Sequence, residues 1–364
     1  MWSRAVACLL VGTLPAIGYA QGDMRIAPEP VCERCSIDLE LVATLGSVDG
    51  PGALSGPVAS IAVDSKGRYY VADHLQNYQI LVYEPNGKFR GIIGRRGEGP
   101  GEYRNIASVH IGPGDTLHVF DGGTRRYTVL GPDWSVVRMR PFPGSVIEAA
   151  STSSGEIVVS ARIMTPDRIG HPLHRFAGVR DSVVSFGSEN PVTPADMRSL
   201  YQQERRIAPS RDGSVWSAYK AQYLIERWGL DGMKKSGFYR VVDWFPPFPE
   251  EHPISPENEP YPALGEIHED RAGRLWVAVW VADTNWKAGI GKMENGPEGS
   301  YYIADHSRLL DTMLEVIDPR TGRLVMSQRV PQFVVAFLSD EMIASYRADD
   351  DGVPFIDIWR MRIR

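Results

Sequence analysis

The chain has 364 residues, of which 43% are hydrophobic, 10% aromatic and 23% charged, and its formal net charge is -6. This composition is ordinary for a globular protein, and the lack of any Lys/Arg-rich run argues against a nucleic-acid-binding domain. The 36 Gly and 27 Pro residues are spread along the chain, which favours many short elements joined by turns over long helices.

The first 20 residues have the pattern of an export signal. A positive charge near the start precedes an almost wholly apolar run from Ala5 to Ile17, and the small residues Gly18 and Ala20 offer a cleavage site. A membrane anchor is the alternative, but this run is interrupted by Pro15 and is shorter than the roughly 20 apolar residues that a spanning helix needs. A lipoprotein signal at Cys8 fits poorly, because the apolar run before it is short. We therefore expect residues 1–20 to be a signal peptide and the mature protein to be periplasmic or extracellular.

The next segment, residues 21–36, contains the two cysteines that remain after cleavage, Cys32 and Cys35, spaced C-x-x-C. In an oxidising compartment such a pair is expected to form a disulfide. A thioredoxin-type redox site needs a βαβ setting, whereas prolines and a strand pattern flank this pair. A zinc site needs further ligands, and the mature chain has no other cysteine. We predict a local structural disulfide.

Residues 37–364 are predicted to form one repeating all-β domain. Six segments share one plan, in which an apolar strand, a tight turn and a second short strand follow one another. These segments are residues 63–73, 111–121, 152–162, 209–219, 269–279 and 337–347.

Most of these segments continue into a third strand and a fourth, joined by another tight turn. Asn86-Gly87, Asp231-Gly232 and Thr321-Gly322 supply the turn chemistry that a hairpin needs. Four antiparallel strands repeated six times predict a six-bladed β-propeller. The last unit is one strand short, and the alternating segment Ile37 to Leu45 is predicted to pair in that C-terminal blade and close the ring.

A family resemblance rests on residues 69–89, "YYVADHLQNYQILVYEPNGKF", and on the "GRRGEGPGEYRNIASVHI" stretch that follows. These stretches resemble the NHL repeat, and the resemblance covers Ser60 to about Leu130. The other four units match less closely, and Gln79-Ile80 stands where the family often has Arg-Ile. The whole chain looks like the exported bacterial six-bladed propeller proteins related to NHL, most of which have no assigned activity. The resemblance therefore implies the fold more firmly than a function.

Within that stretch, residues 94–103, "GRRGEGPGEY", look at first like a phosphate-binding loop. Such a loop places backbone N–H groups at the start of a helix, but here a strand pattern follows, and Glu98 and Glu102 would repel a phosphate. We interpret the stretch as the crossing from the first blade to the second.

In a propeller, the turns between strands one and two and between strands three and four share one face. All of these turns are short, so every long insertion is predicted to lie on the other face: Thr165 to Pro172, Ser188 to Gln203, Asp243 to Pro262 and Asp283 to Asp311. Insertions that gather on one face of a repeat fold usually mark the binding face.

The candidate binding residues combine two tryptophans of these insertions with charged groups at the strand ends of the same mouth. They are Asp73, His74, Asp121, Arg125, Arg126, Arg162, Trp244, Asp283, Trp286 and Arg347. Two simpler interpretations stay open, since the aromatic side chains can pack the loops onto the domain and the charges can form solvated ion pairs.

No catalytic motif is found, so no catalytic residue, metal site or cofactor is predicted. The favoured function is that of an exported, monomeric binding protein that recognises a protein, peptide or glycan on its insertion-rich face. The alternative is a metal-dependent propeller hydrolase or lyase of lactonase type with an axial site. The innermost strands offer Glu148, Glu266, His110 and His268 to such a site.

Overall fold

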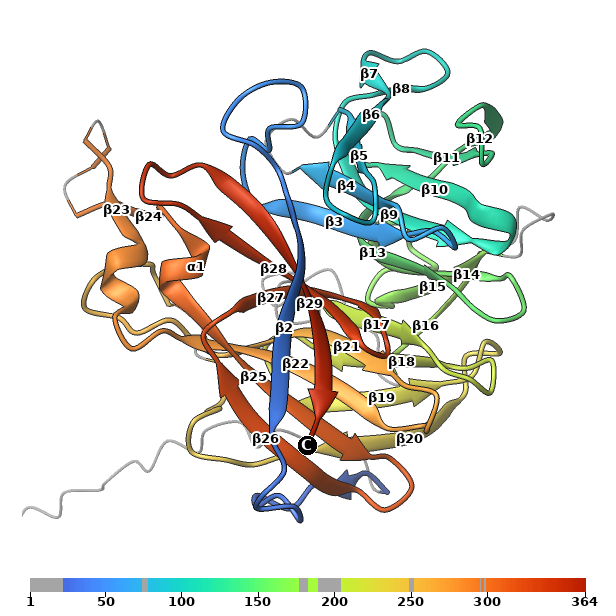
Figure 1. The fold of residues 1–364 in the computed structure, drawn as a ribbon. Coiled ribbons are helices and arrows are strands. Elements are labelled where there is room, and N and C mark those ends of the chain that lie inside the picture. The colour runs from blue at the N-terminus through green and yellow to red at the C-terminus, as the bar shows by residue number, and fades with distance from the viewer. Residues whose placement is uncertain are drawn as a thin grey trace, which may run out of the picture.

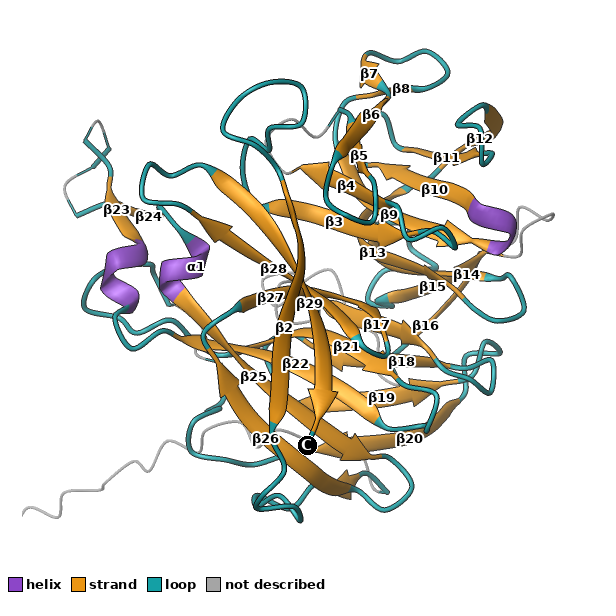
Figure 2. Cartoon of the chain, viewed as in Figure 1, coloured by secondary structure: helices purple, strands orange, loops and turns teal. Residues whose placement is uncertain are grey.

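The computed structural model describes residues 22–73, 78–176, 183–188, 204–248, 252–294, 296–297 and 299–364. Nearly all of its regular structure is β-strand (Figure 2). The predicted signal peptide lies outside the described residues. Within these residues, no helix is long and apolar enough to cross a membrane.

Six sheets, each with four antiparallel strands, form the six predicted blades (Figure 1). Blade 1 contains β3 (Val58–Val63), β4 (Tyr69–Asp73), β5 (Ile80–Tyr83) and β6 (Phe89–Ile93). Blade 2 contains β9 (Ile106–Gly112), β10 (Thr116–Asp121), β11 (Arg126–Leu130) and β12 (Val136–Pro141). Blade 3 contains β13 (Gly144–Ser151), β14 (Ile157–Ile163), β15 (Leu173–Phe176) and β16 (Val183–Phe186).

The second half of the chain repeats this plan. Blade 4 contains β17 (Arg205–Pro209), β18 (Val215–Tyr219), β19 (Leu224–Trp228) and β20 (Lys234–Tyr239). Blade 5 contains β21 (Ala263–Glu269), β22 (Leu275–Ala282), β25 (Leu310–Asp318) and β26 (Arg323–Val330). Blade 6 contains β27 (Phe333–Ser339), β28 (Met342–Ala348), β29 (Pro354–Ile363) and, from the N-terminal side, β2 (Ile37–Leu45). The prediction of an all-β, six-bladed propeller is confirmed.

The turn between the first two strands of a blade is built in the same way in blades 1 and 5. Asp64 accepts hydrogen bonds from the backbone N–H groups of Lys66 and Arg68 at 3.0 and 2.9 Å, and its other oxygen accepts from the Arg68 side chain. Asp270 repeats this arrangement with Ala272 and Arg274. A glycine in the left-handed region lies between the two donors in each turn, at φ 77° for Gly67 and φ 74° for Gly273. The repeated D-x-x-G-R pattern therefore encodes a repeated turn.

The hydrophobic core lies between neighbouring blades, since each sheet buries both faces. Between blades 1 and 2, for example, Tyr70 and Val82 pack with Val109 and Val119. The innermost strands β3, β9, β13, β17, β21 and β27 each contact the innermost strand of the next blade, and β27 contacts β3. The six sheets thus form a closed ring around an axis.

The ring closes through the pairing that the sequence predicts. Strand β2, which is blue in Figure 1, lies antiparallel to β29, which is red, from Ile37 opposite Ile363 to Leu45 opposite Ile356. The side chains of Ile37 and Leu45 are buried, and Thr44 donates a 2.7 Å hydrogen bond to Asp357. Blade 6 therefore combines strands from both ends of the domain.

The segment before β2 runs along the outer edges of blades 4 and 5. Strand β1 (Met24–Arg25) pairs in parallel with β20, and the backbone N–H groups of Val31 and Cys32 donate to Leu324 and Val325 of β26. Cys32 and Cys35 form the predicted disulfide. We call residues 24–35 the N-terminal strap. Its attachment to blades 4 and 5 is not evident from the sequence.

Three of the four predicted insertions lie after second or fourth strands, as predicted, and residues 189–203 of the remaining one, Ser188 to Gln203, lie outside the described residues. The crossing from β20 to β21 contains residues 240–262, and the connection from β22 to β25 contains β23 (Ile290–Lys292), β24 (Tyr301–Ile303) and α1 (His306–Leu309) (Figure 1). The first blade crossing contains only the short parallel pair β7 (Arg95–Arg96) and β8 (Glu102–Tyr103). It is a linker, as predicted, and strand β9 rather than a helix comes directly after it.

Candidate functional site

A largely apolar groove lies on the insertion-rich face, between the crossing 240–262 and the connection from β22 to β25. It contains about 920 Å³ of space, part of it open to solvent. Six aromatic side chains contribute to its lining: Phe248, His252, Tyr261, Trp280, His306 and Phe333. We call it the loop groove.

One wall of the loop groove comes from the proline-rich crossing. Tyr261 makes edge contacts with Phe248, at a centroid distance of 5.2 Å, and with His252, at 4.9 Å. The Tyr261 hydroxyl donates to the backbone oxygen of Pro247 at 2.9 Å. The rings are thus held together before any ligand is present, which reduces the entropy lost on binding.

A second aromatic group comes from blades 5 and 6. Phe333, at the start of β27, lies 5.2 Å from Trp280 and is stacked at 5.9 Å on His306. The indole N–H of Trp280 donates to the backbone oxygen of Val334 at 2.7 Å, so the polar atom of this side chain is satisfied. Its ring therefore contributes apolar surface to the groove.

Few polar side chains line the loop groove. Besides the two histidines these are Lys220 and Asn258, and no carboxylate is present among the described lining residues. Lys220 forms an ion pair at 3.0 Å with Glu204. Concave, mostly apolar surfaces with a few polar groups are typical of ligand sites.

A second hollow, the axial cavity, is lined by residues from the innermost strands of all six blades. It contains about 1030 Å³ of space, part of it open to solvent. It extends from the middle of these strands to Val63, Ser151 and Leu338, close to the face that carries the short turns. The two hollows therefore lie toward opposite faces.

The axial cavity contains three charged side chains from three successive blades. Glu148 lies on β13, Arg206 on β17 and Glu266 on β21. Glu266 Oε1 lies 3.7 Å from Arg206 Nη1, and Glu148 Oε2 accepts a 2.9 Å hydrogen bond from the backbone of Ile207. We call these three residues the axial charge cluster.

Burial disfavours the ionised forms of both glutamates in the axial charge cluster. It raises the pKa of Glu148, although Arg206 and the backbone N–H of Ile207 oppose the shift. It raises the pKa of Glu266 to about 8, opposed by Arg206 and reinforced by the charge of Glu148. The Glu266 side chain is only 13% exposed. At neutral pH, Glu266 is thus expected to hold a proton.

This shift predicts a pH dependence of stability. The unfolded chain loses the Glu266 proton near the ordinary pKa of 4.5, whereas the folded protein keeps it to about 8. The folded state then binds more protons, so the contribution of Glu266 to the free energy of unfolding falls as pH rises through this window, by at most about 1.4 kcal/mol per pH unit. In urea titrations at pH 5, 6.5 and 8, Glu266→Gln should lose less stability with rising pH than the wild type. If the free energies of unfolding of the wild type and the variant changed with pH by the same amount, the raised pKa of Glu266 would be contradicted.

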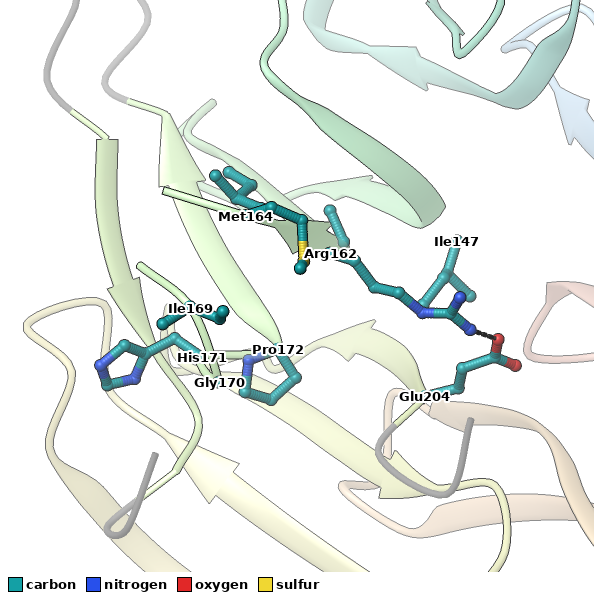
Figure 3. A pocket seen from close by; sticks show the side chains of 10 residues that line it. Ile147, Arg162, Met164, Ile169, Gly170, His171, Pro172 and Glu204 are labelled. Atoms are coloured by element: carbon teal, nitrogen blue, oxygen red, sulfur yellow. Dashed lines mark hydrogen bonds and ion pairs between the residues drawn. The ribbon is translucent and has the colours of Figure 1, made fainter. Parts of the chain in front are cut away.

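A smaller pocket of about 360 Å³ lies beside blade 3 (Figure 3). Arg162 extends across it to form an ion pair with Glu204, while Met164, Ile169 and His171 lie farther along its lining. Glu204 also pairs with Lys220, so this one carboxylate joins Arg162 at the end of β14 to Lys220 at the end of β18.

The two predicted aspartates at strand ends accept hydrogen bonds from the backbone segment that precedes the first strand of their own blade. Asp73 accepts from the backbone of Ser55, and Asp121 accepts from the backbone of Arg104 and Asn105 at 3.0 and 2.7 Å. Both aspartates are buried.

The predicted arginines of the same mouth are largely paired with their own loops. Arg126 donates to the backbone oxygens of Glu98 and Glu102 in the first blade crossing. Arg347 pairs with Asp357 at 2.7 Å. Arg125 is exposed, and its backbone oxygen accepts a hydrogen bond from Phe142. His74 lies outside the described residues.

The remaining three predicted residues lie in the long connections but not in the lining of the loop groove. Trp244 packs on Tyr223 and Phe245, Trp286 packs against the core near Leu309, and Asp283 accepts from the backbone of Asn285. Their role in binding stays a prediction.

Sequence reasoning did not single out Trp280, Phe333 or Arg206. Trp280 and Phe333 follow the ordinary strand pattern, so only the folded ring brings them to the groove. Of the four innermost-strand residues considered for an axial site, Glu148 and Glu266 are brought together. His110 also lines the axial cavity, where its ring stacks on Phe120, whereas His268 lies outside the lining and pairs with Asp340 at 2.9 Å. The described residues contain no group of three or more His, Cys, Asp or Glu placed to hold a metal ion.

Comparison with known proteins agrees with this architecture. Residues 55–126 match a family described as a 6-bladed beta-propeller. The chain is a six-bladed β-propeller. The matched part of the propeller spans blade 1 and half of blade 2, where the NHL resemblance is also strongest. No curated protein matches the sequence.

Solved structures that resemble the propeller share little of its sequence. A member of the DUF4221 family from Bacteroides vulgatus has a TM-score of 0.61 and 10% identity, covering 90% of this chain and 98% of that one. A putative exported protein from Bacteroides fragilis has a TM-score of 0.55 and 12% identity, covering 93% and 99%. A catalytically inactive virginiamycin B lyase from Staphylococcus aureus has a TM-score of 0.48 and 11% identity, covering 89% and 99%. At these identities the likeness concerns the fold alone.

Proposed function

We propose that the propeller is an exported binding protein that holds an apolar or aromatic segment of a peptide or protein partner in the loop groove. The observation that carries this proposal is the meeting of two ring clusters, from the crossing 240–262 and from blades 5 and 6, in one groove. The signal peptide predicted at residues 1–20 and the disulfide support export.

The composition of the groove favours a peptide over a glycan. A sugar presents many hydroxyl groups, each of which needs a polar partner when it is buried. For this purpose the described lining offers only Lys220, Asn258, two histidines and the Tyr261 hydroxyl, which already donates to Pro247. Apolar or aromatic side chains, in contrast, gain affinity by burial against rings such as Phe248 and Phe333.

The proposal predicts a loss of affinity when the crossing wall is removed. Peptides selected from a displayed random library should bind the wild type through aromatic or aliphatic residues. Phe248→Ala/Tyr261→Ala should weaken that binding by about 2–4 kcal/mol, because such rings dominate binding energies. Isothermal titration with the selected peptides measures the change.

The matched control is Trp244→Ala/Trp286→Ala, which removes two rings from the same connections but outside the groove lining. This variant should melt at a lower temperature and keep its affinity. If it loses binding while Phe248→Ala/Tyr261→Ala does not, the site lies around the two tryptophans instead. Binding of glycans alone on an array would exclude a peptide ligand. Turnover of lactones or esters that a chelator abolishes would favour the hydrolase alternative.

A further inference from the structure

We propose that the axial cavity is a second binding site, which takes the ammonium or guanidinium group of a small organic cation between Glu148 and Glu266. This site is separate from the loop groove, because the cavity extends toward the short-turn face and shares no lining residue with the groove.

The charges of the cavity balance only while one of the two glutamates holds a proton. When both are ionised, two carboxylates share one guanidinium, that of Arg206, and the described lining contains no other Lys or Arg. Arg206 lies 3.7 Å from Glu266, and its guanidinium also lies 5.4 Å from the centre of the Trp280 ring. A cation would supply the missing positive charge, whereas an anion near Arg206 would meet both carboxylates.

The backbone directs both carboxylates to this place. The pairing register shifts between Val146 and Glu148 on β13, and between Leu264 and Glu266 on β21. Each shift is an irregularity of the kind that re-aims a side chain, and the same shift recurs on β3 and β27, where the side chains are not charged. The two glutamates thus come from equivalent irregularities in blades 3 and 5, on either side of blade 4.

An organic cation fits the cavity better than a metal ion. Two carboxylates are fewer ligands than Ca²⁺ requires. His110 lines the same cavity, but the described residues contain no group of three or more His, Cys, Asp or Glu placed to hold a metal ion. Two serine hydroxyls of the wall already have partners, since Ser60 bonds the backbone of Val109 and Ser108 accepts from Ala149, whereas the buried Ser151 hydroxyl has none among the described residues and can accept a hydrogen bond from an ammonium group. Ile61, Ile111 and Phe337 make the rest of the wall suitable for an apolar stem. The chemistry points to a primary amine or guanidine on a short hydrocarbon or aromatic body.

Binding should be linked to proton release. The charged groups that face Glu266 are Arg206 from β17 and Glu148 from β13, while the flanking strands β22 and β27 contain no titratable side chain. Because burial keeps Glu266 protonated at neutral pH, an incoming cation must displace that proton. Affinity should therefore rise between pH 6 and 8.

The test is isothermal titration of the full mature chain with benzylamine and agmatine, and with benzyl alcohol and benzoate as neutral and anionic analogues. Saturable binding of an amine, with proton release in buffers of different ionisation enthalpy, is expected. Glu148→Gln/Glu266→Gln should weaken it at least tenfold at pH 8. The matched control Glu204→Gln removes a carboxylate near the opposite face and should leave it unchanged.

Amide replacements keep the shape of the side chains, and thermal melts show whether each variant is folded. The single variants Glu148→Gln and Glu266→Gln, each expected to bind more weakly, give the same test if the double variant is unstable. The proposal is overturned if neither amine binds, if the neutral or anionic analogue binds as well, or if the double variant binds like the wild type. None of these outcomes depends on a ligand in the loop groove.

Discussion

Deletion of residues 22–46 is expected to abolish cooperative folding of the propeller. The deleted segment includes β2, whose Ile37 and Leu45 are buried and which forms one edge of blade 6. Burying each such side chain is worth about 1.5–3 kcal/mol, so these two alone contribute about 3–6 kcal/mol, which reaches the lower end of the roughly 5–15 kcal/mol that stabilises a typical domain. The open edge of β29 would also be free to pair with other chains. Size-exclusion chromatography should show aggregates, and circular dichroism should show no sharp melting transition.

A shorter deletion separates closure of the ring from the N-terminal strap. Removing residues 22–35 eliminates β1 and the disulfide but keeps β2. This protein should remain a folded monomer with a lower melting temperature. If the longer deletion also remained monomeric with an unchanged melting temperature, β2 would not be needed for closure.

The second large effect is expected at a buried ion pair between blades 4 and 5. Arg240 donates to Glu315, which is fully buried on β25 and also accepts from Tyr223 and Ser327. Arg240 further donates to the backbone oxygen of Pro28 at 2.6 Å, so the pair reaches the N-terminal strap. The Arg240→Met variant would leave the Glu315 carboxylate without its cation. We expect a loss of about 3–5 kcal/mol in the free energy of unfolding, measured by urea denaturation.

The double variant Arg240→Met/Glu315→Gln is the control. It removes the charge that Arg240→Met leaves uncompensated, and it should recover a large part of the stability. A double variant as unstable as Arg240→Met would mean that packing of the Arg240 side chain, rather than its charge, stabilises the contact.

The repeating part of this fold could be predicted because each blade carries local signals. The strand pattern, the glycine turns and the C-x-x-C spacing are all local, and the segment Ile37–Leu45 was recognised because the last unit lacked a strand. The long connections were assigned to one face because strand order alone determines where a connection emerges.

The sites could be predicted less well, because they depend on contacts between blades. Trp280 and Phe333 belong to different blades and meet at the loop groove only after the ring forms. The axial charge cluster depends on bulges at Ile147 and Gly265, which no residue pattern announces. Asp73 and Asp121 have the charge expected of ligand contacts, yet their oxygens accept from nearby backbone.

The pairing of β2 with β29 also constrains the order of events during synthesis. Thr44 donates a hydrogen bond to Asp357, 313 residues later in the chain. Strand β2 therefore cannot pair until β29 has been synthesised. Blades 1–5 can form as their strands emerge from the ribosome, because the core strands of each are contiguous or nearly so. Closing so long a loop is slow and comes after local pairing. We expect nascent chains shorter than about residue 354 to remain open rings with β2 unpaired, and ring closure to be the step at which the molecule becomes resistant to proteases.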